Sequence, residues 1–168
     1  MKLVGHPVWI IDKLYAGPGC VDLGNYGINA DIIITLDPSC SVKGDGNQRI
    51  VLPLEDFNVE PIKNIGKAVQ IIDKKLKKNN SVYVHCHAGC GRTGTIVVSY
   101  LILFKDMQLN QAIDIFYEKR HCGPDSMPQE IFLEALYKMK RKLGSNNLVL
   151  KILNKSETLD DFLQNLRE

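Results

Sequence analysis

A cysteine, an arginine and a threonine are spaced in this chain as a phosphate-handling loop requires. Cys86 ends an apolar run, and Arg92 and Thr93 follow after five residues that include two glycines. Glycine lets such a loop turn tightly, so that successive backbone N–H groups can surround one tetrahedral anion. A helix expected to start near Arg92 would point the positive end of its dipole at the same anion. The residues expected to bind phosphate are His87, Ala88, Gly89, Cys90, Gly91 and Arg92.

Displacement at phosphorus is the chemistry that this spacing suits. The field of the loop and of the helix end favours the thiolate of Cys86, which is the nucleophilic form. Its attack on a phosphate monoester forms a phosphocysteine and expels an alkoxide or phenoxide, which needs a proton from an acid. Arg92 can bridge two phosphate oxygens, and Thr93 can hydrogen-bond the departing sulfur. Because these groups neutralise the charge, no metal and no cofactor is expected, and His85 is expected to order the loop backbone.

The acid has to come from another loop at the same edge of a sheet. Apolar runs and helical spacing predict strands at 31–36, 49–54 and 81–85 and a helix at 61–78. This order predicts an α/β fold with a central, mostly parallel sheet flanked by helices. If the last two strands are parallel, their carboxyl ends meet at the edge where ligands bind. Asp56 is therefore the expected acid opposite Cys86, with Glu55 as the alternative.

Shorter elements are expected on both sides of this unit. A hairpin that turns at Asp12 comes first, and a buried helix follows the loop. Asn110 is the expected cap of the next helix, Ser126 and Gln129 form a capping box for another, and Thr158 caps a small terminal helix. A short strand is expected before that terminal helix. These elements are expected at 8–15, 96–104, 111–120, 126–143, Leu148–Leu153 and 159–166.

Length and composition fit a compact protein with one main domain. The chain has 168 residues, a net charge of +2 and five cysteines. We expect a catalytic domain over 1–143 and an extension of unknown role over 144–168, made of a short strand and a helix. The charge gives no case for a nucleic-acid or membrane partner, and no run reaches the roughly 18 apolar residues of a membrane span. An odd cysteine count at irregular spacing favours reduced thiols, which suits the expected cytoplasmic location. A monomer is also expected.

The central motif resembles that of a known family. His85 and Cys86, then five residues, then Arg92 and Thr93 are similar to the HC-x5-R-[S/T] pattern, the CX5R phosphate loop, of cysteine-dependent protein phosphatases. Within them the chain resembles the small dual-specificity phosphatases of the atypical and archaeal kind. The similarity covers roughly 8–143, including an opening hairpin and a loop like the family's general-acid loop.

The resemblance implies a fold, a reaction and a set of roles. It implies the protein tyrosine phosphatase-like fold, with Cys86, Arg92 and Asp56 in the family's catalytic roles. It also implies that Gln129 positions a water molecule. Phosphorylated proteins are the implied partners, with hydrolysis of phosphotyrosine and of phosphoserine or phosphothreonine through a phosphocysteine intermediate.

Other functions remain open at this point. An RNA 5′-phosphatase, a phosphoinositide phosphatase and a module that binds phosphorylated partners without turnover would all use a phosphate loop. Cys90 stands where lipid-directed relatives tend to carry lysine, which gives less support to a phosphoinositide substrate. The near-neutral net charge counts mildly against both RNA and phosphoinositides.

The cysteines allow three further hypotheses. Cys86 can be a buried structural thiol. It can also pair reversibly with Cys90 or Cys122, which would protect it from over-oxidation. The third hypothesis is a metal site, whose ligands would be His85, Cys86, His87 and Cys90 with His121 and Cys122 as a second half.

Overall fold

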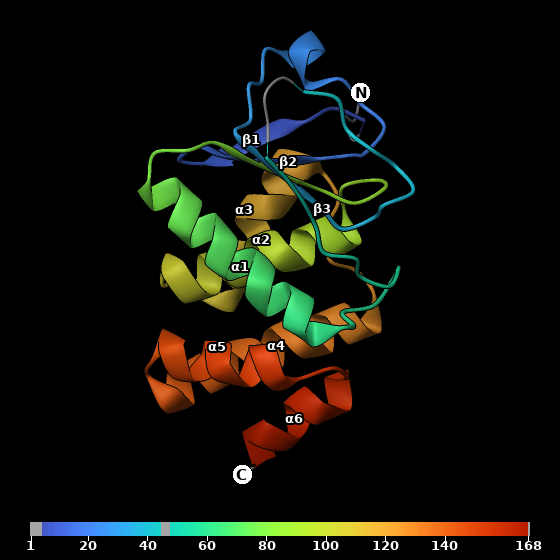
Figure 1. Cartoon of the computed structure of the whole chain (residues 1–168). Coiled ribbons are helices and arrows are strands. Elements are labelled where there is room, and N and C mark those ends of the chain that lie inside the picture. The colour runs from blue at the N-terminus through green and yellow to red at the C-terminus, as the bar shows by residue number, and fades with distance from the viewer. Residues whose placement is uncertain (1–4, 45–47, 168) are drawn as a thin grey trace.

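The described part of the chain contains a five-stranded sheet, which lies toward one end of the molecule with the α-helices on one side of it (Figure 1). The computed structural model describes residues 5–44 and 48–167. The strands run in the order β1-β2-β5-β3-β4, and every neighbouring pair is parallel except the β1–β2 hairpin. The expected α/β fold with a mostly parallel sheet is therefore confirmed. The strands are β1 (Val8–Ile11), β2 (Leu14–Gly17), β3 (Ile32–Thr35), β4 (Gln48–Val51) and β5 (Val82–His85).

The register of the sheet brings the carboxyl ends of its parallel strands to one level. Gly17 of β2 and Thr35 of β3 both pair with His85 of β5. Beyond β4, the Leu52 N–H donates to the Thr35 carbonyl at 2.9 Å and keeps the chain at the same edge. The loops that follow these strands therefore meet at one edge of the sheet, as the crossover argument requires.

The α-helices pack on one face of the sheet and on one another (Figure 1). Helices α1, α2 and α3 contact the sheet, α4 and α5 pack against these helices, and α6 packs against α4 and α5. The apolar residues of all six helices join one buried core with the strand residues on that face. The helices are α1 (Ile62–Lys77), α2 (Gly91–Phe104), α3 (Leu109–Arg120), α4 (Met127–Leu143), α5 (Asn146–Lys155) and α6 (Leu159–Arg167).

The opposite face of the sheet has a smaller core. Side chains alternate between the two faces of a strand, so Ile33 and Tyr83 point away from the helices. They pack with Leu23 and Val42 from the segment that contains the short 3-10 helix η1 (Leu23–Tyr26). This segment covers the sheet where an α-helix would otherwise be needed. It also places residues 18–20 beside the loop that follows β5, because Gly19 N donates to the carbonyl of His87 at 2.9 Å.

The expected strand at Leu148–Leu153 is wrong, because this segment lies within helix α5. Val149, Leu150 and Leu153 are buried on one side of that helix, and α5 packs against α1. The Ser145 hydroxyl caps the helix by accepting the Leu148 N–H at 3.4 Å. A short apolar run fits a strand or a buried helix equally well, and here packing against α1 selects the helix.

Two of the three expected helix caps are confirmed. Ser126 and Gln129 form both halves of the capping box of α4, and the Thr158 hydroxyl accepts the N–H three residues ahead at 3.1 Å. The expected cap at Asn110 is wrong, because the N-cap of α3 is Gln108, which makes no side-chain capping bond. The helix starts earlier because its first residue, Leu109, packs against the core.

The C-terminal helices are built into the same core as the rest of the chain. The Phe162 ring of α6 lies 5.1 Å from the Phe132 ring of α4. None of the helices in the described ranges combines the length and apolar character that a membrane crossing needs.

The chain between α5 and α6 supplies hydrogen-bond acceptors to the start of α1. The first N–H groups of a helix have no acceptor within the helix itself. Here Ile62 N donates to the carbonyl of Glu157 at 3.0 Å, and Lys63 N donates to the carbonyl of Ser156 at 2.9 Å. In return, the Glu60 carboxylate accepts the first N–H of α6 at 2.8 Å. The C-terminal segment is thus bonded to the loop that carries Glu55 and Asp56.

Candidate active site

A pocket of about 500 Å³ opens at the carboxyl edge of the sheet. It is formed by the loops after β3, β4 and β5, the start of α2 and the start of α4. The structure therefore brings the loop of Asp56 and the loop of Cys86 into one pocket, although thirty positions separate them in the sequence. The lining residues are Asp37, Asp56, Phe57, Cys86, His87, Ala88, Cys90, Gly91, Arg92, Asp125 and Gln129.

Cys86 lies at the bottom of this pocket with its sulfur held by two donors. The residue is 3% exposed. Its Sγ accepts the Gly89 N–H at 3.3 Å and the Thr93 hydroxyl at 3.1 Å. The predicted contact between Thr93 and the cysteine sulfur is therefore present.

Arg120 holds the phosphate loop from behind. Its buried guanidinium donates from Nε to the Gly89 carbonyl at 3.0 Å and from Nη2 to the Ala88 carbonyl at 2.9 Å. In a planar trans peptide the carbonyl and the following N–H point in opposite directions. Two carbonyls turned toward Arg120 therefore turn the next two N–H groups toward the pocket. The role of Arg120 was missed, although its four-residue spacing from Ala112 and Phe116 places it on the buried face of α3.

Position 89 requires glycine, because of its backbone conformation and because a side chain there has no room. Its φ is +75°, in the left-handed region that side chains disfavour. A Cβ built on it would lie 2.2 Å from the carbonyl carbon of Gly17. The loop therefore packs directly on the backbone at the end of β2.

The guanidinium of Arg92 is bonded through its two Nη atoms, whereas its Nε has no acceptor among the described residues. Its Nη2 lies 3.2 Å from Asp37 Oδ2 and 3.4 Å from Asp56 Oδ1, and its Nη1 donates to the Leu54 carbonyl at 3.3 Å. The side chain is 7% exposed. Within the described residues, its Nε is buried and has no acceptor. A buried donor without a partner is costly, so an oxyanion in the pocket would be a favourable ligand for Arg92.

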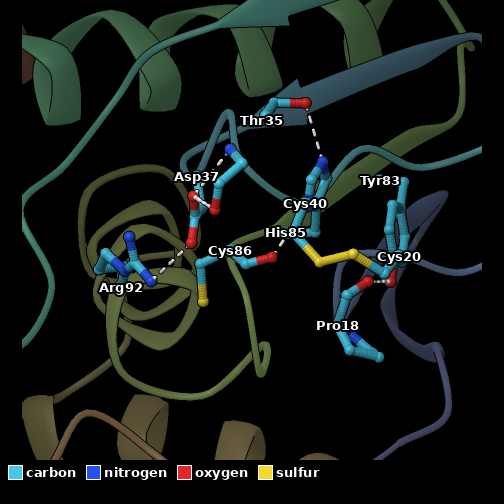
Figure 2. The surroundings of a disulfide bond; sticks show 10 residues. Pro18, Cys20, Thr35, Asp37, Cys40, Tyr83, His85, Cys86 and Arg92 are labelled. Atoms are coloured by element: carbon cyan, nitrogen blue, oxygen red, sulfur yellow. Dashed lines mark hydrogen bonds and ion pairs between the residues drawn. A yellow bond between two sulfur atoms is a disulfide. The ribbon is translucent and has the colours of Figure 1, made fainter.

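Asp37 is a site residue that the sequence interpretation missed. Figure 2 shows its carboxylate directed at the Arg92 guanidinium, beside Cys86. Hydrogen bonds from the hydroxyl and the N–H of Ser39, together with the positive charge of Arg92, hold the pKa of Asp37 below its ordinary value against the effect of burial. A signal was available, because Asp37 directly follows a strand that ends at the ligand-binding edge.

The structure separates the two candidate acids. Asp56 lines the pocket, and its side chain is 62% exposed. Its Oδ1 accepts the Phe57 N–H at 3.0 Å, which orients the carboxylate toward Arg92. Glu55 does not line the pocket, and its Oε2 accepts from the Asn58 amide at 3.1 Å.

Gln129 both caps α4 and lines the pocket. Its Oε1 accepts the N–H groups of Asp125 and Ser126 at 3.2 and 3.3 Å. Its Nε2 donates to the Asn58 carbonyl at 3.4 Å, which ties the start of α4 to the loop of Asp56. A Cβ built on Gly91 would lie 2.9 Å from this amide nitrogen. The amide therefore lies directly against Gly91 of the phosphate loop.

His85 lies behind the loop as a neutral imidazole. Its Nδ1 is 3.0 Å from the Cys86 carbonyl, and its Nε2 is 2.8 Å from the Thr35 hydroxyl (Figure 2). Because a carbonyl only accepts, Nδ1 must carry the proton, and the hydroxyl of Thr35 donates to Nε2. Burial lowers the pKa of His85. The contact with the loop backbone matches the expected ordering role.

The expectation of reduced thiols is wrong. Cys20 is bonded to Cys40, Cys90 is bonded to Cys122, and Cys86 is free. Figure 2 shows the first of these bonds beside Cys86. Cys90 starts α2 and Cys122 follows α3, so the second bond ties the phosphate loop to the chain before α4.

These disulfides contradict two hypotheses. The structure does not pair Cys86 with Cys90 or Cys122, because those two residues are bonded to each other. Their sulfurs are then not available as metal ligands, and both ring nitrogens of His85 are already hydrogen-bonded. In the described ranges, no group of three or more His, Cys, Asp or Glu residues is arranged to hold a metal ion.

Comparison with known proteins gives the family. The model of the dual specificity phosphatase catalytic domain matches residues 21–142, which is more than half of the chain. The chain therefore belongs to the dual specificity phosphatase family.

Relatives in this family differ in length and in the substrate that their names give. Putative tyrosine phosphatase 123R of Invertebrate iridescent virus 6 is 26% identical over 84% of this chain and 97% of that protein. Dual specificity protein phosphatase 7 of Homo sapiens is 29% identical over 82% of this chain and 34% of that protein. Phosphatidylglycerophosphate phosphatase PTPMT2 of Arabidopsis thaliana is 37% identical over 48% of this chain and 36% of that protein. The chain thus spans only about a third of the length of each of the last two relatives.

The fold is shared with solved phosphatase structures. Tk-PTP in its active form aligns with a TM-score of 0.70 at 18% identity, covering 79% of this chain and 96% of that one. The expected protein tyrosine phosphatase-like fold is confirmed.

Proposed function

We propose that this chain is a protein phosphatase that hydrolyses phosphotyrosine and phosphoserine or phosphothreonine through a phosphocysteine intermediate. The observation that carries the proposal is the arrangement around Cys86. Its sulfur receives two hydrogen bonds at the bottom of a pocket, while the buried Nε of Arg92, unpaired within the described residues, lies beside it. One wall of the same pocket carries Asp56.

In the first step the Cys86 thiolate attacks phosphorus. An S–P bond forms, the bond from phosphorus to the leaving oxygen breaks, and Asp56 gives its proton to that oxygen. The loop N–H groups and the Arg92 guanidinium stabilise the charge on the three other oxygens.

In the second step water attacks the phosphocysteine. The water gives a proton to Asp56, an O–P bond forms and the S–P bond breaks, which returns the Cys86 thiolate and inorganic phosphate. The Thr93 hydroxyl, 3.1 Å from Sγ, stabilises the departing sulfur. Gln129, with its amide over the loop, is the residue that would orient the water.

Hydrolysis of a small aryl phosphate tests the proposal. Wild type should turn over, and Cys86→Ser should lose activity by a factor of at least about 10³, because the serine hydroxyl is a far weaker nucleophile at neutral pH. Acid quenching during turnover should leave a phosphoryl group on the peptide that contains Cys86. An inert wild type that still binds phosphate would support the phosphate-binding module instead.

Asp56→Ala and Glu55→Ala form a matched pair that tests the acid. Only the true acid should slow alkyl phosphates more than aryl phosphates, because an alkoxide needs the proton more. We expect this pattern for Asp56→Ala and a nearly unchanged ratio for Glu55→Ala. Equal effects of both substitutions would remove Asp56 from the mechanism.

A lipid phosphate monoester is the second candidate substrate, because the name of the Arabidopsis thaliana relative gives phosphatidylglycerophosphate as its substrate. A panel of phosphopeptides, inositol lipids, phosphatidylglycerophosphate and 5′-triphosphate RNA separates the classes. Faster hydrolysis of the lipids or the RNA than of every peptide would replace the protein-phosphatase proposal.

A further inference from the structure

The charged side chains that line the pocket are unusual for a site that takes an anion. They are the aspartates Asp37, Asp56 and Asp125 and a single guanidinium, that of Arg92. Within the described ranges, no lysine lines the pocket. Asp37 and Asp56 both approach the same Nη2 of Arg92. Asp125 is exposed at the start of α4.

Positive charge is confined to the floor of the pocket. Arg92 has a 7% exposed side chain, and its buried Nε has no acceptor among the described residues. Arg92 lines the pocket, and its guanidinium suits one oxyanion. Arg120 is fully buried and engages the carbonyls on the far side of the loop. Neither arginine can reach a second phosphate outside the pocket.

The mouth of the pocket is therefore acidic, and it carries one large exposed aromatic. Phe57 is 69% exposed and directly follows Asp56. An aromatic face beside a carboxylate attracts the stem and charge of a lysine or arginine. A second phosphate near Asp125 would instead be repelled.

We infer that the site selects a phosphomonoester carried on a peptide segment with lysine or arginine next to the phosphorylated residue. This inference rests on the proposed phosphatase function and narrows its substrate class. A single phosphate reaches the floor, where Asp56 holds the proton that it donates, while a flanking cation meets the Asp125 carboxylate and the Phe57 ring at the mouth. Substrates with several phosphates are repelled at the mouth, whereas a peptide with lysine or arginine beside the phosphorylated residue is attracted there.

Two phosphopeptides that differ only in flanking residues test this inference. One carries lysine and the other glutamate on both sides of the phosphotyrosine, and kcat/KM is measured for each. A pair of unit charges about 7 Å apart in a largely solvated setting changes a binding constant by about threefold, favourably for lysine and unfavourably for glutamate. We expect the lysine peptide to be favoured by about tenfold, and the ratio should fall toward one as salt screens the charges.

The ratio is then measured in two matched variants. Asp125→Lys should reduce or reverse the preference, and because a ratio is compared, any general change in turnover cancels. Asp114→Lys makes the same charge change at an exposed position of α3 that does not line the pocket, and it should leave the ratio unchanged. Equal shifts in both variants would assign the preference to net charge and overturn the role of the mouth.

An aryl phosphate run in parallel keeps the two proposals separate. Loss of all hydrolysis would contradict the phosphatase function itself. Hydrolysis of the aryl phosphate with equal rates for the two peptides would leave the phosphatase standing and overturn the selectivity. A soluble inositol bisphosphate that is hydrolysed faster than the lysine peptide would overturn it as well.

Discussion

Replacing Arg120 should show how much of the site depends on support from behind the phosphate loop. Arg120→Met keeps most of the side-chain volume but removes the donors to the carbonyls of Ala88, Gly89 and His6. Each carbonyl left without a donor costs about 1–3 kcal/mol, and release of a buried charge from its desolvation returns part of this. We expect a net loss of about 3–5 kcal/mol in the free energy of unfolding.

Two measurements check this expectation. Denaturant unfolding gives the stability, and competitive inhibition by inorganic phosphate reports whether the loop N–H groups still face the pocket. We expect phosphate to inhibit at least about tenfold more weakly in Arg120→Met, since a tenfold loss corresponds to only about 1.4 kcal/mol. Arg120→Lys keeps the charge but cannot bond two carbonyls with one planar group, so it should fall between methionine and wild type.

The neighbouring Lys119 provides the control. It lies over the Trp9 ring at 4.3 Å and does not touch the loop. Lys119→Met should change stability by less than about 1 kcal/mol and leave phosphate inhibition unchanged. If Arg120→Met behaves like Lys119→Met in both measurements, the support ascribed to Arg120 is wrong.

Three further predictions concern the loop and its surroundings. Gly89→Ala should lower the free energy of unfolding by at least about 3 kcal/mol, because the added Cβ has no room. Gly27→Ala is the control, since Gly27 also has a positive φ but lies in open space, and it should cost only about 1 kcal/mol. Equal losses for the two variants in denaturant melts would contradict the packing argument. Burial lowers the folded-state pKa of His85, so stability should fall as pH drops below the unfolded value near 6.5 and stop falling once pH is below the folded value. His85→Gln should flatten that part of the stability curve, and an unchanged curve would count against the assignment. Replacing both Cys90 and Cys122 by serine should lower the free energy of unfolding by about 3–4 kcal/mol, as expected for a closed loop of this length. Peptide mapping that finds both thiols free in the native protein would refute the disulfide itself.

The geometry of the loop was predictable because it depends on residues that are close in the sequence. The spacing of Cys86, Arg92 and Thr93 is local, and a loop with glycines between a strand and a helix has few conformations that suit it. The position of Asp56 was predictable for a different reason. The crossover from β4 to β5 leaves parallel strands only one way to place their carboxyl ends.

What escaped prediction depends on contacts between distant segments. Asp37 and Arg120 each approach the loop from another element, and neither residue belongs to the central motif. The two disulfides required knowing that Cys90 and Cys122 come within 5.4 Å between Cα atoms, across 32 positions of sequence. The mistaken strand at Leu148–Leu153 has the same origin, because packing against α1 determines whether that segment forms a helix or a strand.

The carbonyl groups of Ser156 and Glu157 that receive the first N–H groups of α1 have a consequence for dynamics. These N–H groups belong to Ile62 and Lys63, which come directly after the loop of Asp56. Local opening of the C-terminal helices would free both N–H groups and loosen that loop in the same event. Hydrogen exchange at Ile62 and Lys63 should therefore slow when phosphate occupies the pocket, and proteolytic nicking near Gly144 should speed it. The last helices and the acid loop would then open and close as one cooperative unit.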